Sequence, residues 1–205
     1  MKLRRVTPGI VFWEHRVTDD EPSLVKRCLA GDSASIRQLI ARYESDVFGL
    51  SMRVLAHRQD AEDVTQETFV RVFRSLKRWD SARPLRPWIL RIAFNRCRTW
   101  MSQRARRPEL VDYLQETAGK EVPDDAAELA GEIQISLLAL RPEFRSVFVM
   151  FHDQGMSYEE IAEVHERPVG TIKTWLHRTR MEVLNHLRKR GMVPDEVNTN
   201  KTVGE

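Results

Sequence analysis

The stretch SYEEIAEVHERPVGTIKTWLHRTR, residues 157–180, carries the strongest local signals in the chain. Ser157 followed by Glu160 predicts a capping box, in which each side chain satisfies a backbone N–H group at the start of a helix. A short turn at 165–167 leads to Pro168, after which apolar residues recur at three- and four-residue spacing. Helix, short turn and second helix form the pattern of a helix-turn-helix.

The polar face of the second predicted helix carries residue types that contact phosphates and base edges in a DNA major groove. Glu166 stands at the turn position where glycine is often found, so the turn depends on Arg167 and Pro168 instead. The alternative is an ordinary αα-hairpin inside a helical bundle. The basic character of the following helix favours DNA binding. The candidate contact residues are Thr171, Lys173, Thr174, His177, Arg178 and Arg180.

A second basic segment precedes this one. Eight arginines and no acidic residue occur between Arg83 and Arg107. The segment contains a loop expected at 80–87 and a helix expected at 88–104. Aromatic residues interleaved with arginines suit single-stranded nucleic acid, because rings stack on unpaired bases and guanidinium groups hold phosphates. Trp100 is the better stacking candidate, since Trp88 falls on the apolar stripe of the helix.

The charges of the chain are arranged in blocks, although the net charge is only +3. Residues 109–132 contain eight acids and one base, whereas 167–190 contain seven bases and one acid. Two basic blocks around an acidic one predict two anion-binding surfaces joined by a segment that avoids the anion. Solvated helix faces are the simpler alternative, but 25 residues without an acid, at 83–107, are unusual.

The N-terminal half also has the periodicity of helices. Asp32 or Ser33 is expected to cap a long helix of about six turns. Asp60 is expected to be the N-cap of the next helix, with Asp63 in its first turn. The outer face of that helix is acidic and polar: Glu62, Asp63, Gln66 and Glu67.

No constellation of catalytic or metal-binding residues is present in the sequence. It has no glycine-rich phosphate loop and no HExxH motif, and neighbouring Glu159 and Glu160 point in different directions on a helix. Cys28 and Cys97 form no CxxC pair, which argues against a disulfide scaffold or a thiolate zinc site. No apolar run approaches the roughly 18 residues that span a bilayer. We therefore expect a cytoplasmic protein with no membrane insertion, no enzymatic activity, no metal and no cofactor.

The fold class expected from these patterns is all-α, with two small helical domains joined by a flexible acidic linker. The expected organisation is an N-terminal extension (1–22), a first helical domain (23–107), the linker (108–127), a helix-turn-helix domain (128–190) and a flexible tail (191–205).

Three segments together resemble bacterial RNA polymerase sigma factors of the extracytoplasmic-function (ECF) group of the sigma-70 family. They are DAEDVTQETFVRVFRSL at 60–76, PLRPWILRIAFNRCRTW at 84–100, and LRPEFRSVFVMFHDQGMSYEEIAEVHERPVGTIKTWLHRTR at 140–180. They occur in the order of that family, and the resemblance covers roughly residues 24–190. Trp175 departs from it, because the family usually has arginine there.

The resemblance implies a promoter-specificity subunit whose first domain is region 2 and whose second is region 4. The partners would be core RNA polymerase, through its clamp and flap, and promoter DNA, with an anti-sigma protein as the family's usual further partner. The second helix of the helix-turn-helix would read the −35 element. The acidic helix would dock on core polymerase through Asp60, Asp63, Gln66 and Glu67. Recognition and melting of the −10 element would fall to Ser81, Arg83, Arg86, Arg91, Asn95, Arg98 and Trp100.

Two other hypotheses remain at this stage. A stand-alone helix-turn-helix regulator that binds an operator as a dimer would need only the C-terminal domain. It would leave the acidic helix and the arginine-rich helix without a role. An enzyme acting on nucleic acid would need a catalytic constellation that the sequence lacks.

Overall fold

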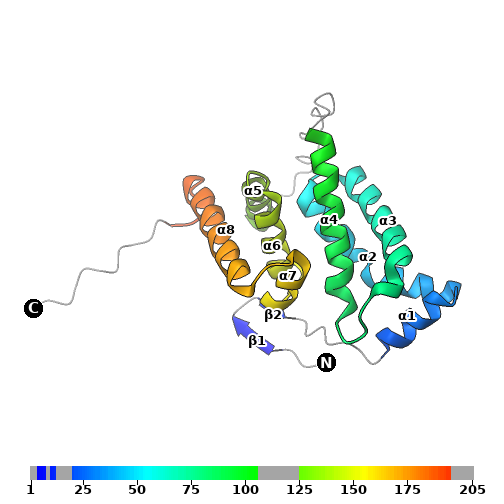
Figure 1. The fold of residues 1–205 in the computed structure, drawn as a ribbon. Helices are drawn as coiled ribbons and strands as arrows, with labels where there is room; N and C mark the ends of the chain where they lie inside the picture. Colours follow the sequence, from blue (N-terminus) through cyan, green and yellow to red (C-terminus); the bar gives the residue numbers. More distant parts are fainter. Residues whose placement is uncertain (1–3, 8–9, 13–19, 106–124, 195–205) are drawn as a thin grey trace, which may run out of the picture.

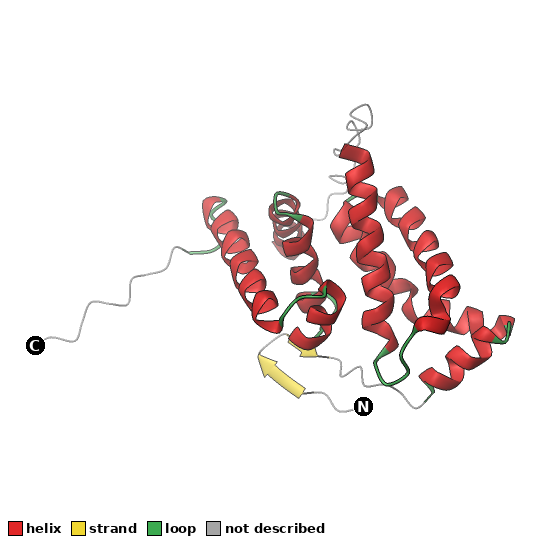
Figure 2. Cartoon of the chain, viewed as in Figure 1, coloured by secondary structure: helices red, strands yellow, loops and turns green. Residues whose placement is uncertain are grey.

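The computed structural model of the 205-residue chain describes residues 4–7, 10–12, 20–105 and 125–194. Within these ranges the fold is almost entirely helical (Figure 2), in agreement with the expected class. A short antiparallel pair, β1 (Arg4–Thr7) and β2 (Ile10–Phe12), lies in the N-terminal extension, where no strand is expected from the sequence. Two strands of four and three residues leave the all-α class unchanged.

The first domain consists of helices that pack around α2, the longest of them. Asp32 caps α2 through side-chain oxygens that accept from the backbone N–H groups of Ala34 (3.3 Å) and Ser35 (3.1 Å). The helices are α1 (Glu21–Leu29), α2 (Ser33–Leu55), α3 (Arg58–Ser75), the 3₁₀ turn η1 (Leu76–Arg78) and α4 (Leu85–Ala105).

Two expected helix starts in this domain are wrong. His57, not Asp60, is the N-cap of α3, because its Nδ1 accepts the backbone N–H of Asp60 at 3.2 Å. The helix α4 begins at Leu85 rather than at 88, so Pro87 lies inside the first turn. Proline is tolerated there because first-turn N–H groups have no partner within the helix.

The second domain contains α5 (Asp125–Leu138), α6 (Pro142–His152), α7 (Tyr158–His165) and α8 (Val169–Lys189). The capping box is confirmed: Ser157 Oγ accepts from the N–H of Glu160 at 3.1 Å, and the Glu160 carboxylate accepts from the N–H of Ser157 at 2.8 Å. The start of α5 shows that residues 125–127, assigned above to the linker, are helical. The rest of the expected linker, 108–124, and the tail from 195 lie outside the described residues.

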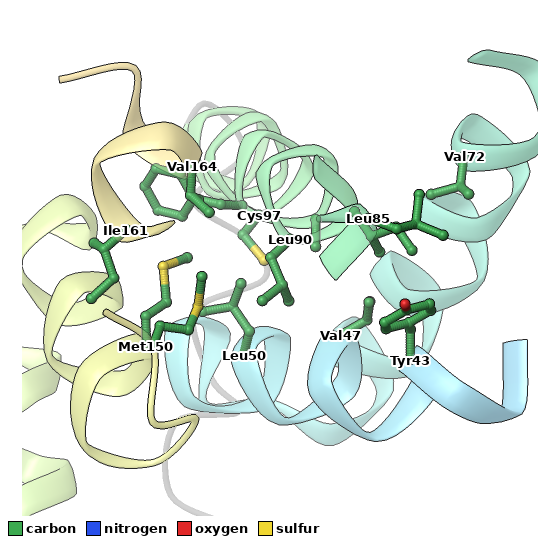
Figure 3. Packing of buried hydrophobic residues seen from close by; sticks show 14 of the residues in the cluster. Tyr43, Val47, Leu50, Val72, Leu85, Leu90, Cys97, Met150, Ile161 and Val164 are labelled. Atoms are coloured by element: carbon green, nitrogen blue, oxygen red, sulfur yellow. The ribbon is translucent and has the colours of Figure 1, made fainter. Parts of the chain in front are cut away.

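The two domains pack side by side (Figure 1) and share a hydrophobic core. Met150 and Ile161, from α6 and α7, face Leu50, Leu90 and Cys97, from α2 and α4 (Figure 3). Each of these side chains is fully buried, and burial of a Leu, Ile or Met contributes about 1.5–3 kcal/mol. The sequence predicts the two domains, but their close association is a finding of the structure.

A buried arginine also stabilises the contact between the two domains. Arg145 of α6 donates to the carbonyls of Leu137 (2.9 Å) and Leu138 (2.7 Å), at the end of α5. It also donates to the carbonyl of Val54, in the last turn of α2. Carbonyls at helix C-termini have no partner within the helix and carry partial negative charge, so they suit a buried cation. Burial lowers the pKa of Arg145 to about 10, which leaves it charged near neutral pH.

Candidate nucleic-acid and polymerase interface

The helix-turn-helix consists of α7 and α8 with a tight turn between them. Glu166 ends α7 in the left-handed conformation (φ 53°), which is where a glycine would be expected, as the sequence indicates. Pro168 then precedes α8. Ile172 and Leu176 are buried and hold α8 against the domain, so the opposite face of the helix points to solvent.

The predicted −35 residues lie along this exposed face, with two qualifications. Lys173, Thr174, His177 and Arg178 are exposed, whereas Thr171 is half-buried in the first turn of α8. Arg180 turns back toward α6. Its Nε donates to His152 Nε2 at 3.1 Å, and its guanidinium lies 4.9 Å from the ring centre of Phe151.

Two of the exposed cations lie over aromatic rings. The Arg178 guanidinium lies 5.4 Å from the centre of the Phe144 ring, and Lys173 Nζ lies 5.5 Å from that of Tyr158. Such contacts restrict the side chains while leaving the charge available. Trp175 packs edge-on against Phe144 at 5.4 Å, so the tryptophan that departs from the family pattern has a packing role.

The second cationic site is a groove of about 470 Å³ between α3 and α4. The exposed amide of Asn95, one of the predicted −10 residues, lines it, and the surrounding side chains are mostly arginines. Most of these residues are not among those predicted from the sequence. Helical periodicity could have identified them. Positions 74 and 75 lie three and four residues after 71, and position 78 lies four and three residues after them, so all four fall on one helix face. The lining residues are Arg71, Arg74, Ser75, Arg78, Ile92, Asn95, Arg96 and Thr99.

A second hollow, of about 370 Å³, adjoins the loop before α4. Arg83 and Arg91 line it together with Trp79 and Trp88, so two predicted −10 residues and two indole rings lie together. The predicted residue Ser81 is exposed in the loop.

The remaining −10 candidates differ in exposure. Arg98 is exposed on α4. Trp100 is half-buried, and the Arg96 guanidinium lies 5.7 Å from the ring centre of Trp100. The prediction for Arg86 is wrong, because its side chain is only 3% exposed. It donates to the Asp46 carboxylate at 2.7 Å and to the carbonyl of Gln154 at 3.0 Å. Arg86 therefore fixes the start of α4 in the fold and offers no surface to DNA.

The four predicted polymerase-docking residues on α3 differ in whether their side chains are exposed or form ion pairs within the fold. Asp63 and Gln66 are exposed. Asp60 is 14% exposed and pairs with Arg104 of α4, while Glu67 pairs with Arg96. Asp60 is therefore mostly engaged within the fold, and the free part of this face centres on Asp63 and Gln66.

Other kinds of site find no support in the part of the chain described. There, no group of three or more His, Cys, Asp or Glu could hold a metal ion. Both cysteines are free and buried. None of the described helices combines the length and the apolar composition needed to cross a membrane.

Comparison with known proteins assigns both halves of the chain. The family described as Sigma-70 region 2 matches residues 39–107, and that described as Sigma-70, region 4, matches residues 131–183. The ECF RNA polymerase sigma factor SigW of Bacillus subtilis is 31% identical over 179 residues, which cover 80% of this chain and 95% of SigW. The ECF RNA polymerase sigma-E factor of Haemophilus influenzae is 28% identical over 181 residues, 82% of this chain and 95% of that protein.

Solved structures agree in fold. CnrH, in complex with the cytosolic domain of CnrY, superimposes with a TM-score of 0.63 at 25% identity over 83% of this chain and 99% of CnrH. The sigma factor RpoE of Bartonella quintana, crystallised with the anti-sigma factor NepR, has a TM-score of 0.59 at 19% identity over 74% of this chain and 96% of RpoE. No finding favours the stand-alone regulator. The chain belongs to the ECF group of the sigma-70 family, the promoter-recognition subunits of RNA polymerase.

Proposed function

We propose that α8 reads the −35 element of a promoter from the major groove. The support is the row of four exposed polar and cationic side chains, Lys173, Thr174, His177 and Arg178, on one face of a helix-turn-helix. Cationic and hydroxyl side chains on such a face contact phosphates and base edges. Arg180 has a supporting role, because it is held against His152.

We propose further that the groove between α3 and α4, with the adjoining loop, holds the unpaired strand of the −10 element. Asn95 offers an amide for a base edge, the arginines offer partners for phosphates, and the indoles of Trp79 and Trp88 offer surfaces for stacking. Taking a base out of the stack costs a few kcal/mol, which such contacts can offset.

The exposed acidic face of α3, around Asp63 and Gln66, is the proposed contact with core polymerase. A negative face on a DNA-binding protein would be repelled by phosphate, so it suits a protein partner. The proposed site of action is the cytoplasm, and the proposed role is recognition without catalysis of its own. An anti-sigma partner for this chain remains a prediction.

The observation that carries the proposal is the presence of two cationic surfaces on two domains, with a separate acidic face on α3. The test is run-off transcription with purified core polymerase and the full chain. The wild-type protein should direct initiation from one start site, and Asp63→Lys should reduce both core binding and transcription. Glu44→Lys, at an exposed position of α2, is the matched control. Absence of core-dependent initiation by the wild type would favour the operator-binding regulator.

A further inference from the structure

A row of aromatic residues on α6 lies beside α8, the helix that we assign to the −35 element. Phe144, Phe148 and Phe151 are spaced four and three residues apart, so their side chains share one face of α6. Helix α6 packs against α8 (Figure 1). Rings from a helix outside the helix-turn-helix itself therefore reach side chains of the reading helix.

Two of these rings contact cations of α8, but only one of the two cations is exposed. The guanidinium group of Arg180 lies 4.9 Å from the centre of the Phe151 ring, and its Nε also donates to His152 at 3.1 Å. The guanidinium group of Arg178 lies 5.4 Å from the centre of the Phe144 ring, and this side chain is exposed. Phe144 is thus the residue of the row that adjoins a proposed DNA contact.

Trp175 contacts the Phe144 ring from the side. The two rings meet edge to face, with their centres 5.4 Å apart and their planes at 86°, which is a favoured arrangement for aromatic pairs. Trp175 and Arg178 are three residues apart on α8, so both side chains reach the same ring of α6. The buried Thr179 hydroxyl lies 3.3 Å from the carbonyl oxygen of Phe144 and 2.9 Å from that of Trp175. The backbone and the ring of Phe144 are therefore both held relative to α8.

The contact between Arg178 and Phe144 is compatible with phosphate binding. A guanidinium group is planar, so a ring attracts its face while its N–H donors point outward in the plane. Arg178 can therefore keep its contact with Phe144 while it donates to phosphate oxygens. Arginine side chains have many rotamers, and binding restricts them at a cost in entropy. A ring that already restricts Arg178 in the unbound protein reduces that cost.

Lys173 provides a contrast on the same exposed face of α8. Its Nζ lies 5.5 Å from the centre of the Tyr158 ring. An ammonium group is a compact point charge whose donors are not confined to a plane. Tyr158 therefore restrains where the charge of Lys173 lies but not the direction of its donors, whereas a ring beside Arg178 restrains both.

We propose that Phe144 and Trp175 are positioning residues for −35 recognition, which hold the Arg178 guanidinium group in the orientation that contacts a DNA phosphate. Neither aromatic residue needs to touch the DNA itself. The inference rests on the proposed role of α8 as the −35 reader. It adds that α6 determines how well one cation of α8 binds.

A double-mutant cycle tests whether Phe144 acts through Arg178. The probe is a fluorescent duplex that carries the upstream sequence block selected by the full chain together with core polymerase. Phe144→Leu should weaken binding of the full chain to this duplex about threefold, which is the size of an exposed cation–π contact. In the Arg178→Ala background, the same substitution should change affinity less than about 1.5-fold, because the group that Phe144 holds is absent. Equal losses in the two backgrounds would overturn the positioning role.

Further variants separate the contribution of the ring from an effect on folding. Phe144→Tyr keeps the ring and should bind like the wild type, whereas Trp175→Leu should weaken binding about twofold, and only when Arg178 is present. Phe148→Leu is the matched control, because it removes a half-buried ring that lies beside His152 on the same face of α6. Its effect should be the same with and without Arg178. A loss in Phe144→Tyr as large as that in Phe144→Leu would overturn the proposal.

The Arg178→Ala variant alone tests the proposed function separately. If it binds the duplex as tightly as the wild type does, Arg178 makes no DNA contact, and both its proposed contact and its positioning fail. If it loses about tenfold in affinity while Phe144→Leu has equal effects in the two backgrounds, the −35 assignment stands and only the positioning role fails.

Discussion

Helices α4 and α8 are both 21 residues long and rich in cations, yet they present their charge differently. On α8, Lys173 and Arg178 are exposed and lie over aromatic rings. On α4, four arginines pair with carboxylates from α2, α3 and the end of α7. These pairs are Arg86–Asp46, Arg91–Glu166, Arg96–Glu67 and Arg104–Asp60.

The comparison shows that a cationic block in a sequence does not reveal whether its charge is available. The segment 83–107 has no acid of its own, but its arginines pair with carboxylates at positions 46, 60, 67, 80, 163 and 166. The proposed −35 surface carries exposed cations, whereas several arginines of the proposed −10 surface pair with carboxylates.

The largest effect is expected at Arg145 of α6, because its hydrogen bonds hold α6 against the ends of α2 and α5. Arg145→Leu would leave several buried helix-end carbonyls without a donor, so the free energy of unfolding should fall by about 3 kcal/mol or more. Urea unfolding measures the change. Arg141→Leu, at the exposed position before α6, should change stability by less than about 0.5 kcal/mol. Equal losses of unfolding free energy in the two variants would contradict the role of Arg145 in holding the two domains together.

Acid should also destabilise the folded state. Burial, together with nearby arginines, lowers the pKa of His165 to about 4, and burial and Arg180 lower that of His152 to about 4. Both values lie below 6.5, so the unfolded chain binds more protons between these limits. The stabilisation is complete above about pH 6.5 and declines as the pH falls toward 4, with a loss of about 2 kcal/mol expected from each histidine between pH 7 and pH 5. Denaturation midpoints across this range measure it.

His165→Gln serves as the sharper test, because it should make stability less dependent on pH while leaving the contribution of His152. A wild-type protein that became more stable on acidification through this range would contradict the assignment.

On the exposed surface, Arg178→Ala should weaken binding to duplex −35 DNA about tenfold. It should also reduce the slope of log affinity against log salt by about one, because one phosphate contact is lost. Fluorescence anisotropy at several salt concentrations measures both quantities. Glu182→Gln, at an exposed position on the same helix, provides the comparison. An unchanged affinity and slope would exclude Arg178 from the interface.

The smallest effect is expected at Asn95, for which we propose a role only after the DNA has opened. Asn95→Ala should spare −35 binding and reduce permanganate reactivity of melted thymines about fivefold, the loss of roughly one hydrogen bond to a base. Ser102→Ala, at an exposed position on α4 that does not line the groove, should have no effect. Normal melting by the Asn95 variant would argue against the groove as the strand-binding site.

Local features of this fold were predictable from the sequence because short-range interactions determine them. The capping box at Ser157 and the short turn before Pro168 follow from neighbouring residues. The same holds for the exposed face of α8, since burial of Ile172 and Leu176 sets its orientation.

Features that depend on distant residues were not predictable. Arg86 resembles its exposed neighbours in sequence, yet Asp46, 40 positions away, holds it in the interior. His57 rather than Asp60 is the N-cap of α3, and the Asp60 carboxylate in the first turn pairs with Arg104 of α4, 44 positions away. The packing of α7 on α4 likewise joins segments that no local periodicity connects.

The most direct test of the account is selection of promoter DNA from a random pool by the full chain assembled with core polymerase. Two domains that read two elements predict enrichment of two unlike sequence blocks at a fixed spacing, and the upstream block should change when Lys173 and Thr174 are replaced. Enrichment of one inverted repeat, or of the same sequences with and without polymerase, would contradict the account.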